Sequence, residues 1–129
     1  MTKTLVDPGW TWDKPYFYSQ ALRARDLLFV SGQAAIAPDG TIIGEGDFEA
    51  QAHQALANLE SVLKAAGAAL KDIVKVTVFV TDMRNFPKVV ELRKQYFSPP
   101  YPADSIVQVQ ALALPELMIE IEAIAWLSP

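Results

Sequence analysis

The stretch Met118-Ile-Glu-Ile-Glu-Ala-Ile-Ala-Trp126 alternates with the two-residue period of a β-strand. One face is wholly apolar and consists of Ile119, Ile121, Ala123, Ala125 and Leu127. The opposite face carries two carboxylates, Glu120 and Glu122, in otherwise apolar surroundings. A charge without a partner is costly in such a strand. We therefore expect the first face to be core, and we look for function on the second.

The composition indicates one compact domain. The chain has 129 residues, of which 51% are hydrophobic and 20% charged, enough for a real core. We expect a single domain over residues 1–129, with residues 1–16 as an N-terminal arm laid over the surface. The formal charge of −4 argues against a nucleic-acid partner held by phosphate neutralisation.

The residue types present also exclude several kinds of site. The chain has no cysteine and one histidine, which excludes disulfides, thiolate nucleophiles and the usual metal clusters, so we expect no cofactor and no metal. No stretch approaches the roughly 20 apolar residues of a membrane span, and the first residues lack the apolar run of a signal peptide. We expect no membrane partner and a cytoplasmic location.

Local patterns predict the elements in order. A β-hairpin is expected from strands at 17–22 and 27–33, with a short edge strand at 41–43 after the Pro38-Asp39-Gly40 turn. A helix is predicted from the N-cap Asp47 to the stop at Gly67, and a second over 86–97. Further strands are predicted at 73–81, 103–109 and 118–126.

The order β-β-(β)-α-β-α-β-β predicts an α+β fold with a single mixed β-sheet and two helices packed on one face. Each strand-helix-strand unit should join parallel neighbours by a right-handed crossover. Val74, Val76, Val78 and Val80 should lie under the helices. The far face should hold Leu27, Phe29, Ser31, Gln33, Thr77, Phe79, Ile106, Gln108, Glu120, Glu122 and Trp126. That mixture suits a homo-oligomer with polar clefts between its subunits.

Several stretches together resemble the reactive intermediate deaminase family, also called Rid or YjgF. They are YSQA (18–21), FVSGQ (29–33), ALANLESVLKAAGAAL (55–70), IVKVTVFVTDM (73–83) and IEIEAIA (119–125). The resemblance implies a chorismate-mutase-like fold, a homotrimer, and a small-molecule ligand in the clefts between subunits. In archetypal members it also implies hydrolysis of an enamine or imine formed from an amino acid to a keto acid and ammonia.

The same resemblance implies roles for individual residues. Glu120 would be catalytic, positioning or deprotonating the attacking water. Tyr18 would flank the substrate, and Ser31 and Gly32 would line the pocket with backbone groups. One carboxylate is enough as a base, because an imine carbon is already electrophilic.

One departure from the family pattern changes the expected substrate. Archetypal members read PARS at the start of the penultimate strand, and that arginine binds the substrate carboxylate through a bidentate pair. This chain reads Pro102-Ala103-Asp104-Ser105, followed by the apolar Ile106. We expect Asp104 and Ile106 to contact the substrate, and Asp104 to disfavour one with an α-carboxylate. An extra Tyr16-Phe17 pair and a longer loop at 113–115 should reshape the rim.

Simpler interpretations of the same residues stay open. Glu120 can pair with Lys75, Arg23 or backbone donors, and Tyr18 can be a packed aromatic residue. Asp104 can cap nearby amides at the start of its strand. Ser31 has no histidine near it in sequence, and we expect His53 to be a solvated surface residue.

Three functions follow from these patterns. The first is a Rid-type hydrolase acting on a small imine or enamine that lacks the α-carboxylate. The second is a non-catalytic homologue that binds a small metabolite in the same clefts. The third, an endoribonuclease activity attributed to some relatives, fits this acidic chain poorly.

Overall fold

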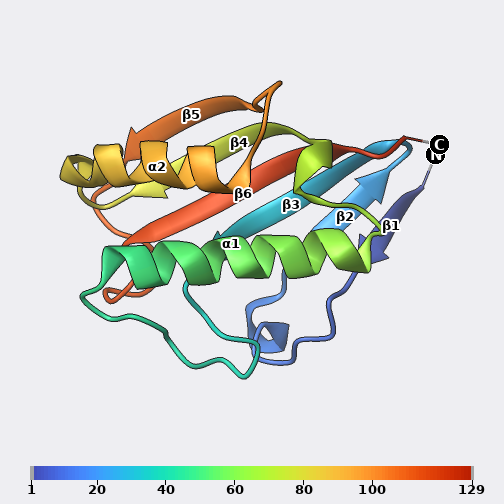
Figure 1. Ribbon diagram of the computed structural model, residues 1–129. Helices are drawn as coiled ribbons and strands as arrows, with labels where there is room; N and C mark the ends of the chain where they lie inside the picture. Colours follow the sequence, from blue (N-terminus) through green and yellow to red (C-terminus); the bar gives the residue numbers. More distant parts are fainter. Residues whose placement is uncertain (1, 129) are drawn as a thin grey trace.

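The computed structural model describes residues 2–128, so Met1 and Pro129, the ends of the predicted domain, lie outside the described residues. A mixed sheet has the strand order β1-β2-β3-β6-β4-β5. Two helices cover one face of this sheet, as predicted (Figure 1). The strands are β1 (Lys3–Val6), β2 (Ala21–Ala24), β3 (Leu27–Ala34), β4 (Ile73–Val80), β5 (Ala103–Gln108) and β6 (Ile119–Trp126). The helices are α1 (Phe48–Ala65) and α2 (Phe86–Tyr96), and short 3-10 helices lie at Lys14–Tyr16, Leu70–Asp72 and Met83–Asn85.

The last strand of the chain lies inside the sheet. Strand β6 pairs antiparallel with β3 on one side and with β4 on the other. The prediction that β3 and β4 are parallel neighbours is therefore wrong, because β6 separates them. Strands β4 and β5 do pair in parallel around α2. A strand paired on both sides and covered on one face can bury an unbroken apolar row, and the apolar face of β6 is buried from Ile119 to Leu127.

Helix α1 begins and packs as its sequence predicts. The N-cap Asp47 accepts a hydrogen bond from the Ala50 amide at 3.1 Å, which satisfies one of the free donors of the first turn. Its apolar stripe is buried against the sheet and includes Ala52, Ala55, Leu56, Leu59, Val62 and Leu63.

Along residues 2–128 the structure contains no helix with both the length and the apolarity to cross a bilayer.

The N-terminal arm differs from the prediction. Instead of only lying over the surface, residues Lys3–Val6 form β1, which pairs antiparallel with β2 at the edge of the sheet. The first hairpin strand begins at Ala21 rather than at residue 17, because residues 14–16 coil into a 3-10 helix. The strand expected at 41–43 is reduced to a single bridge between Ile36 and Ile42.

Strand β4 slips by one residue at its start. The pairing with β6 is irregular between Ile73 and Lys75. As a result Ile73 is 5% exposed, whereas Val74 is 46% exposed. The prediction that Val74 shares the buried face with Val76, Val78 and Val80 is wrong for this residue. An extra residue in one strand reverses the facing of the residues before it.

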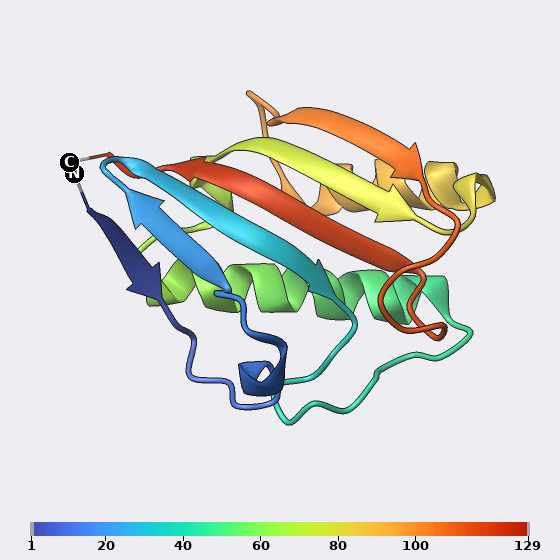
Figure 2. The ribbon, with the colours of Figure 1, turned by 180° about the vertical axis from the view of Figure 1, so that it is seen from behind.

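The side chains of β5 face the opposite sides of the sheet from those predicted. In the parallel register Asp104 lies beside Val76, Ile106 beside Val78, and Gln108 beside Val80, all on the helix-covered side. Ile106 accordingly packs against the core. Gln33 is also buried, because a bulge in β3 between Val30 and Gln33 shifts its facing. The uncovered face, seen from behind in Figure 2, therefore lacks Ile106, Gln108 and Gln33.

The slip in β4 predicts a contrast between adjacent residues. Ile73→Ala should lower the free energy of unfolding by about 2–5 kcal/mol, because it leaves a cavity in the core. Val74→Ala should change it by no more than about 0.5 kcal/mol. Chemical denaturation of both variants measures the difference. Equal losses would contradict the slipped register.

Candidate functional site

A cavity of about 490 Å³ lies where the 3-10 helix Lys14–Tyr16, β3, β6 and the loop before β6 meet. Its wall brings together Tyr18, Ser31, Gly32 and Glu120, four of the residues that the sequence selected. The remaining lining residues are Trp12, Tyr16, Gln33, Ala34, Ile36, Gly40, Asn58, Ala113, Leu114 and Leu117. The volume falls within the roughly 300–1,000 Å³ of typical small-molecule sites.

The bulge in β3 creates room for Glu120. Between the pairs Val30–Ala123 and Gln33–Ile121, strand β3 has one residue more than β6. A Cβ atom at Gly32 would lie 2.5 Å from Cδ and 2.8 Å from Cγ of Glu120. No other amino acid fits at position 32 while the Glu120 side chain holds this position, so the glycine and the carboxylate depend on each other.

The Glu120 carboxylate is half-buried and makes no hydrogen bond or ion pair within residues 2–128. The alternative pairing with Lys75 or Arg23 is not formed. Lys75 donates to Ser105 Oγ at 2.9 Å, and Arg23 donates to the Arg25 carbonyl at 2.8 Å. Burial, and then the nearby charge of Glu122, raise the pKa of Glu120 above its ordinary value. A carboxylate with a raised pKa and no partner is a stronger base than an ordinary glutamate.

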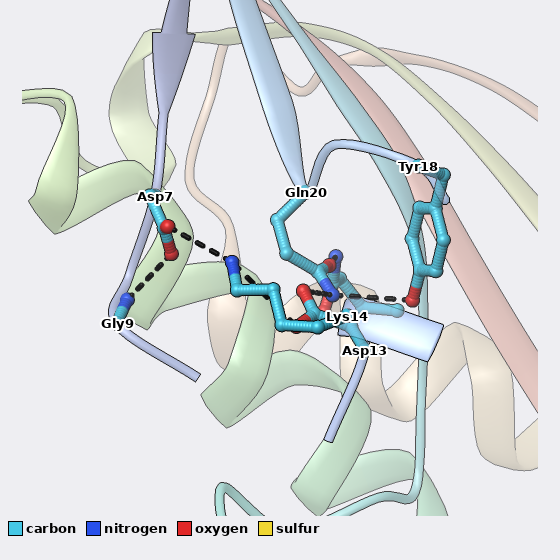
Figure 3. A network of polar contacts seen from close by, with 7 residues as sticks. Asp7, Gly9, Asp13, Lys14, Tyr18 and Gln20 are labelled. Carbon is cyan, nitrogen blue, oxygen red and sulfur yellow. Dashed lines mark hydrogen bonds and ion pairs between the residues drawn. The ribbon is translucent and has the colours of Figure 1, made fainter. Parts of the chain in front are cut away.

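A buried amide relay positions the Tyr18 hydroxyl. Gln33 Nε2 donates to Gln20 Oε1 at 2.8 Å and to the Ser31 carbonyl at 3.0 Å. Gln20 Nε2 in turn donates to Asp13 Oδ2 at 2.9 Å and to Tyr18 Oη at 3.1 Å (Figure 3). Tyr18 therefore accepts from the protein and keeps its own hydrogen for a ligand. Burial raises the pKa of Tyr18, so this hydroxyl remains a donor at neutral pH.

The hydrogen bond between Gln20 and Asp13 also holds the 3-10 helix Lys14–Tyr16 against the sheet. Asp13 is buried, and its Oδ1 lies 3.9 Å from Lys14 Nζ. The same ammonium donates to Asp7 Oδ2 at 3.1 Å, and Asp7 accepts from the Gly9 amide at 2.8 Å (Figure 3). The hydrogen bond from Gly9, and then the one from Lys14, lower the pKa of Asp7. These contacts hold in place the stretch of backbone that contains Tyr16 and Tyr18.

The hydroxyl of Ser31 is not arranged as a nucleophile. Its Oγ donates to the Ser19 carbonyl at 2.6 Å. His53 is not the freely solvated residue that the sequence suggested, because its Nδ1 lies 2.6 Å from the Tyr96 hydroxyl, between α1 and α2. Residues 2–128 contain no cluster of three or more potential ligands that could hold a metal ion.

Asp104 and Ile106 do not join this cavity within one chain. Arg93 of α2 binds Asp104 through two hydrogen bonds, Nε to Oδ2 at 3.0 Å and Nη2 to Oδ1 at 2.8 Å. The guanidinium also lies 5.7 Å from the centre of the Phe86 ring. Both partners are partly buried, and the fork geometry ties α2 to the edge strand. The expectation that Asp104 and Ile106 share a face with Glu120 is wrong, since β5 has the opposite phase.

Tyr16 and Leu114 line the cavity and belong to the two segments that the sequence placed at its rim. The sequence did not select Trp12, Leu117 or Asn58. Trp12 lies in the segment expected to be a surface arm, and Leu117 belongs to a loop without a regular period. Asn58 gave a signal that could have been used, because it is a polar residue beside the apolar stripe of α1. It is buried and donates to the carbonyls of Ala34 at 2.9 Å and Ile36 at 2.7 Å. These bonds fix the turn after β3.

The fold and the cavity together define a small α+β protein with one unpaired, half-buried carboxylate in a ligand-sized site. The model of the family described as Endoribonuclease L-PSP matches residues 14–127, and the chain belongs to this family. This confirms the Rid/YjgF resemblance found in the sequence.

The chain is similar to named members of this family. It is 43% identical to a RutC family protein of Pyrococcus horikoshii, covering 84% of this chain and 86% of that one. It is 40% identical to the 2-iminobutanoate/2-iminopropanoate deaminase of Mus musculus, covering 87% and 82%. A solved structure of a Rid family protein from Yersinia pestis superposes with a TM-score of 0.86 at 36% identity, over 98% of this chain and 100% of that one.

The contact between Gly32 and Glu120 predicts a coupled loss of stability. Gly32→Ala should lower the free energy of unfolding by about 1–3 kcal/mol, because the added methyl group displaces Glu120. In a Glu120→Ala background the same change should cost much less. Denaturation of the two single variants and the double variant measures this coupling. Additive losses would mean that the two residues do not depend on each other.

Because burial and the charge of Glu122 both raise the pKa of Glu120, removal of the Glu122 charge should lower this pKa only in part. Glu122→Gln should lower the pKa of Glu120 yet leave it above the ordinary glutamate value, because burial is the larger cause. Carbon-13 NMR titration of the side-chain carboxyls measures this, with the remote and exposed Glu49→Gln as control. The folded state holds this proton more tightly, so ionisation of Glu120 lowers stability as pH rises between the unfolded and folded pKa values. An unchanged Glu120 titration in Glu122→Gln would contradict this assignment.

Proposed function

We propose that this chain hydrolyses a small imine or enamine, with Glu120 as the base that activates water. The observation that carries the proposal is the half-buried carboxylate, with a raised pKa and no partner, on the wall of a ligand-sized cavity. The similarity to the mouse 2-iminobutanoate/2-iminopropanoate deaminase supports the same reaction class.

The reaction needs few groups. Glu120 takes a proton from a held water as the water oxygen adds to the imine carbon, and it passes this proton to the nitrogen, which gives a carbinolamine. Glu120 then takes the hydroxyl proton of the carbinolamine and delivers it to the nitrogen as the carbon–nitrogen bond breaks. Tyr18, whose hydroxyl hydrogen is not used within the protein, donates a hydrogen bond to the leaving nitrogen, and ammonia and the carbonyl compound are released. General base catalysis of this kind contributes roughly 10²- to 10⁴-fold.

The substrate of this site lacks an α-carboxylate. Within residues 2–128 no lysine, arginine or histidine lines the cavity. Asp104 replaces the arginine expected from the family pattern, and the nearby Arg93 is bound to it by both of its contacting nitrogens. A carboxylate in this cavity would meet Glu120 without a compensating cation.

The active unit is a homotrimer that packs the uncovered sheet face. That face carries several exposed large apolar side chains, among them Leu27, Phe29, Val107 and Trp126. Asp104 and Ile106 contact a ligand only if it lies between two copies of the chain, as in the clefts implied by the family resemblance. The trimer therefore belongs to the same proposal as the substrate-binding role of these two residues.

A comparison of two glutamine variants tests the base role. Imines generated in place by amine oxidases and by amino-acid oxidases are supplied, and ammonia release is followed at pH 8. Glu120→Gln should reduce the enzyme-dependent rate by about 10²- to 10⁴-fold. Glu122→Gln is the matched control, since it removes the same charge from the same strand, and it should retain most of the rate.

Equal rates for wild type and Glu120→Gln would exclude Glu120 as the base. Saturable binding of imine analogues without turnover would favour the non-catalytic binding protein. RNA cleavage that survives repurification and is lost in Glu120→Gln would support the endoribonuclease hypothesis. The formal charge of −4 argues against that hypothesis.

A further inference from the structure

The cavity has an aromatic wall that simple imines of two or three carbons do not need. Trp12, Tyr16 and Tyr18 all line it and come from one short segment. Ile36, Leu114 and Leu117 add apolar surface from two loops. A substrate of a few heavy atoms would leave much of the 490 Å³ filled by water.

The Trp12 side of the aromatic wall is held in place by its neighbours before any ligand binds. The Trp12 ring stacks on Trp10 with centroids 6.4 Å apart and planes inclined by 22°, and Trp10 is buried. Gly40 lies so close that a Cβ atom there would be 3.0 Å from Trp12 Cβ, and its φ of 90° suits glycine. Tyr16 and Tyr18 lie on the segment anchored through buried Asp13 and Gln20. A fixed aromatic surface binds a flat ring with little loss of conformational entropy.

Several side-chain donors on the wall are already bound within the protein, whereas the Tyr18 hydroxyl hydrogen and the Trp12 indole N–H have no partner among residues 2–128. Both hydrogens of the Asn58 amide are bound by the carbonyls of Ala34 and Ile36, and those of Gln33 by Gln20 and Ser31. The Ser31 hydroxyl donates to the backbone. Within residues 2–128, Glu120 is the one charged side chain on the wall. The site therefore complements a ligand with a cationic or hydrogen-donating end and a flat apolar end.

We infer that the cavity takes a protonated imine bearing a single aromatic ring, with the ring against Trp12 and Tyr16 and the C=N group beside Glu120. This inference rests on the proposed function and names its substrate class. The reaction is ArCH=NH₂⁺ + H₂O → ArCHO + NH₄⁺, with no oxidant or reductant. The imine must be supplied by a separate oxidation of an arylalkyl amine, in which another enzyme removes the two electrons. Trp12 and Tyr16 are then specificity residues.

Stable amidines test the ligand class without any turnover. Benzamidine is a flat aromatic cation that resembles a protonated aryl imine, acetamidine has the same cation without the ring, and benzoate has the ring with the opposite charge. Isothermal titration calorimetry should show benzamidine binding at least about 10-fold more tightly than acetamidine, and no binding of benzoate. Acetamidine that binds as tightly as benzamidine, or benzoate that binds better, would overturn the inference.

Matched variants locate the ring. Tyr16→Ala should weaken benzamidine binding by about 3- to 10-fold, because Tyr16 is 66% exposed and its loss removes ring contact without opening the core. Tyr101→Ala is the control, since Tyr101 is 53% exposed and does not line this cavity. Benzamidine binding by Trp12→Leu is a second measurement of the ring contact, with cooperative thermal unfolding as the check that this variant is folded. Equal binding by wild type and Tyr16→Ala would remove the proposed aromatic contact.

A turnover comparison separates this inference from the proposed function. Imines made from benzylamine and from ethylamine by an amine oxidase are compared after subtraction of spontaneous hydrolysis. The expected result is a larger kcat/KM for the aryl imine, a preference that Tyr16→Ala reduces chiefly through KM. Turnover without an aryl preference would overturn the inference alone. Benzamidine binding without turnover of either imine would overturn the proposed function and leave the ligand class standing.

Discussion

Strand β6 has to satisfy two environments with one alternating pattern, and the rest of the molecule depends on how it does so. Its apolar side chains are buried beneath the helices, while Glu120 and Glu122 face the other way. The strand is paired on both sides, so its backbone is satisfied and its facing is fixed. A change of register by one residue would place both carboxylates in the core. The position of the candidate base is therefore set by the same packing that holds the sheet together.

The environment of Glu120 favours chemistry at the expense of stability. The neighbouring strand makes room with a bulge and a glycine, and no cation within residues 2–128 neutralises the carboxylate. A nearby lysine would stabilise the fold and lower the basicity of the group. Instead Lys75 is bound to Ser105 on the neighbouring strand. By contrast, the partly buried charges of Arg93 and Asp104 are paired with each other.

The sequence predicted the parts of the site that lie on continuous, strongly patterned segments. The two faces of β6 follow from strict alternation, and the family-like stretches around Tyr18, Ser31 and Gly32 carried their placement beside Glu120. The class of the fold followed from the order of the elements and the stripe of α1.

The failures share a physical origin in single-residue shifts and long-range pairing. Val74 looks like its valine neighbours in sequence, and only pairing with β6 shows that Ile73 takes the core position. The facing of Asp104 depends on its partner Val76 and on Arg93 from another element. Trp12 lies in a segment without a period, so its place in the cavity depends on stacking with Trp10 and on the loop at Gly40. Such contacts leave no periodic trace in the sequence.

The position of β6 also has a consequence for how the chain is made. The strand that pairs with both β3 and β4 follows them in the chain, so the two halves of the sheet have no common neighbour until this strand has been synthesised. Until then the hairpin with α1 and the β4-α2-β5 unit each expose an open strand edge, which is a template for unwanted pairing. Closure by the final strand joins residues far apart in the chain, a slow kind of contact to form. The strand that carries the candidate base is thus also the one that completes the sheet, so a chain cut short before it would lack both.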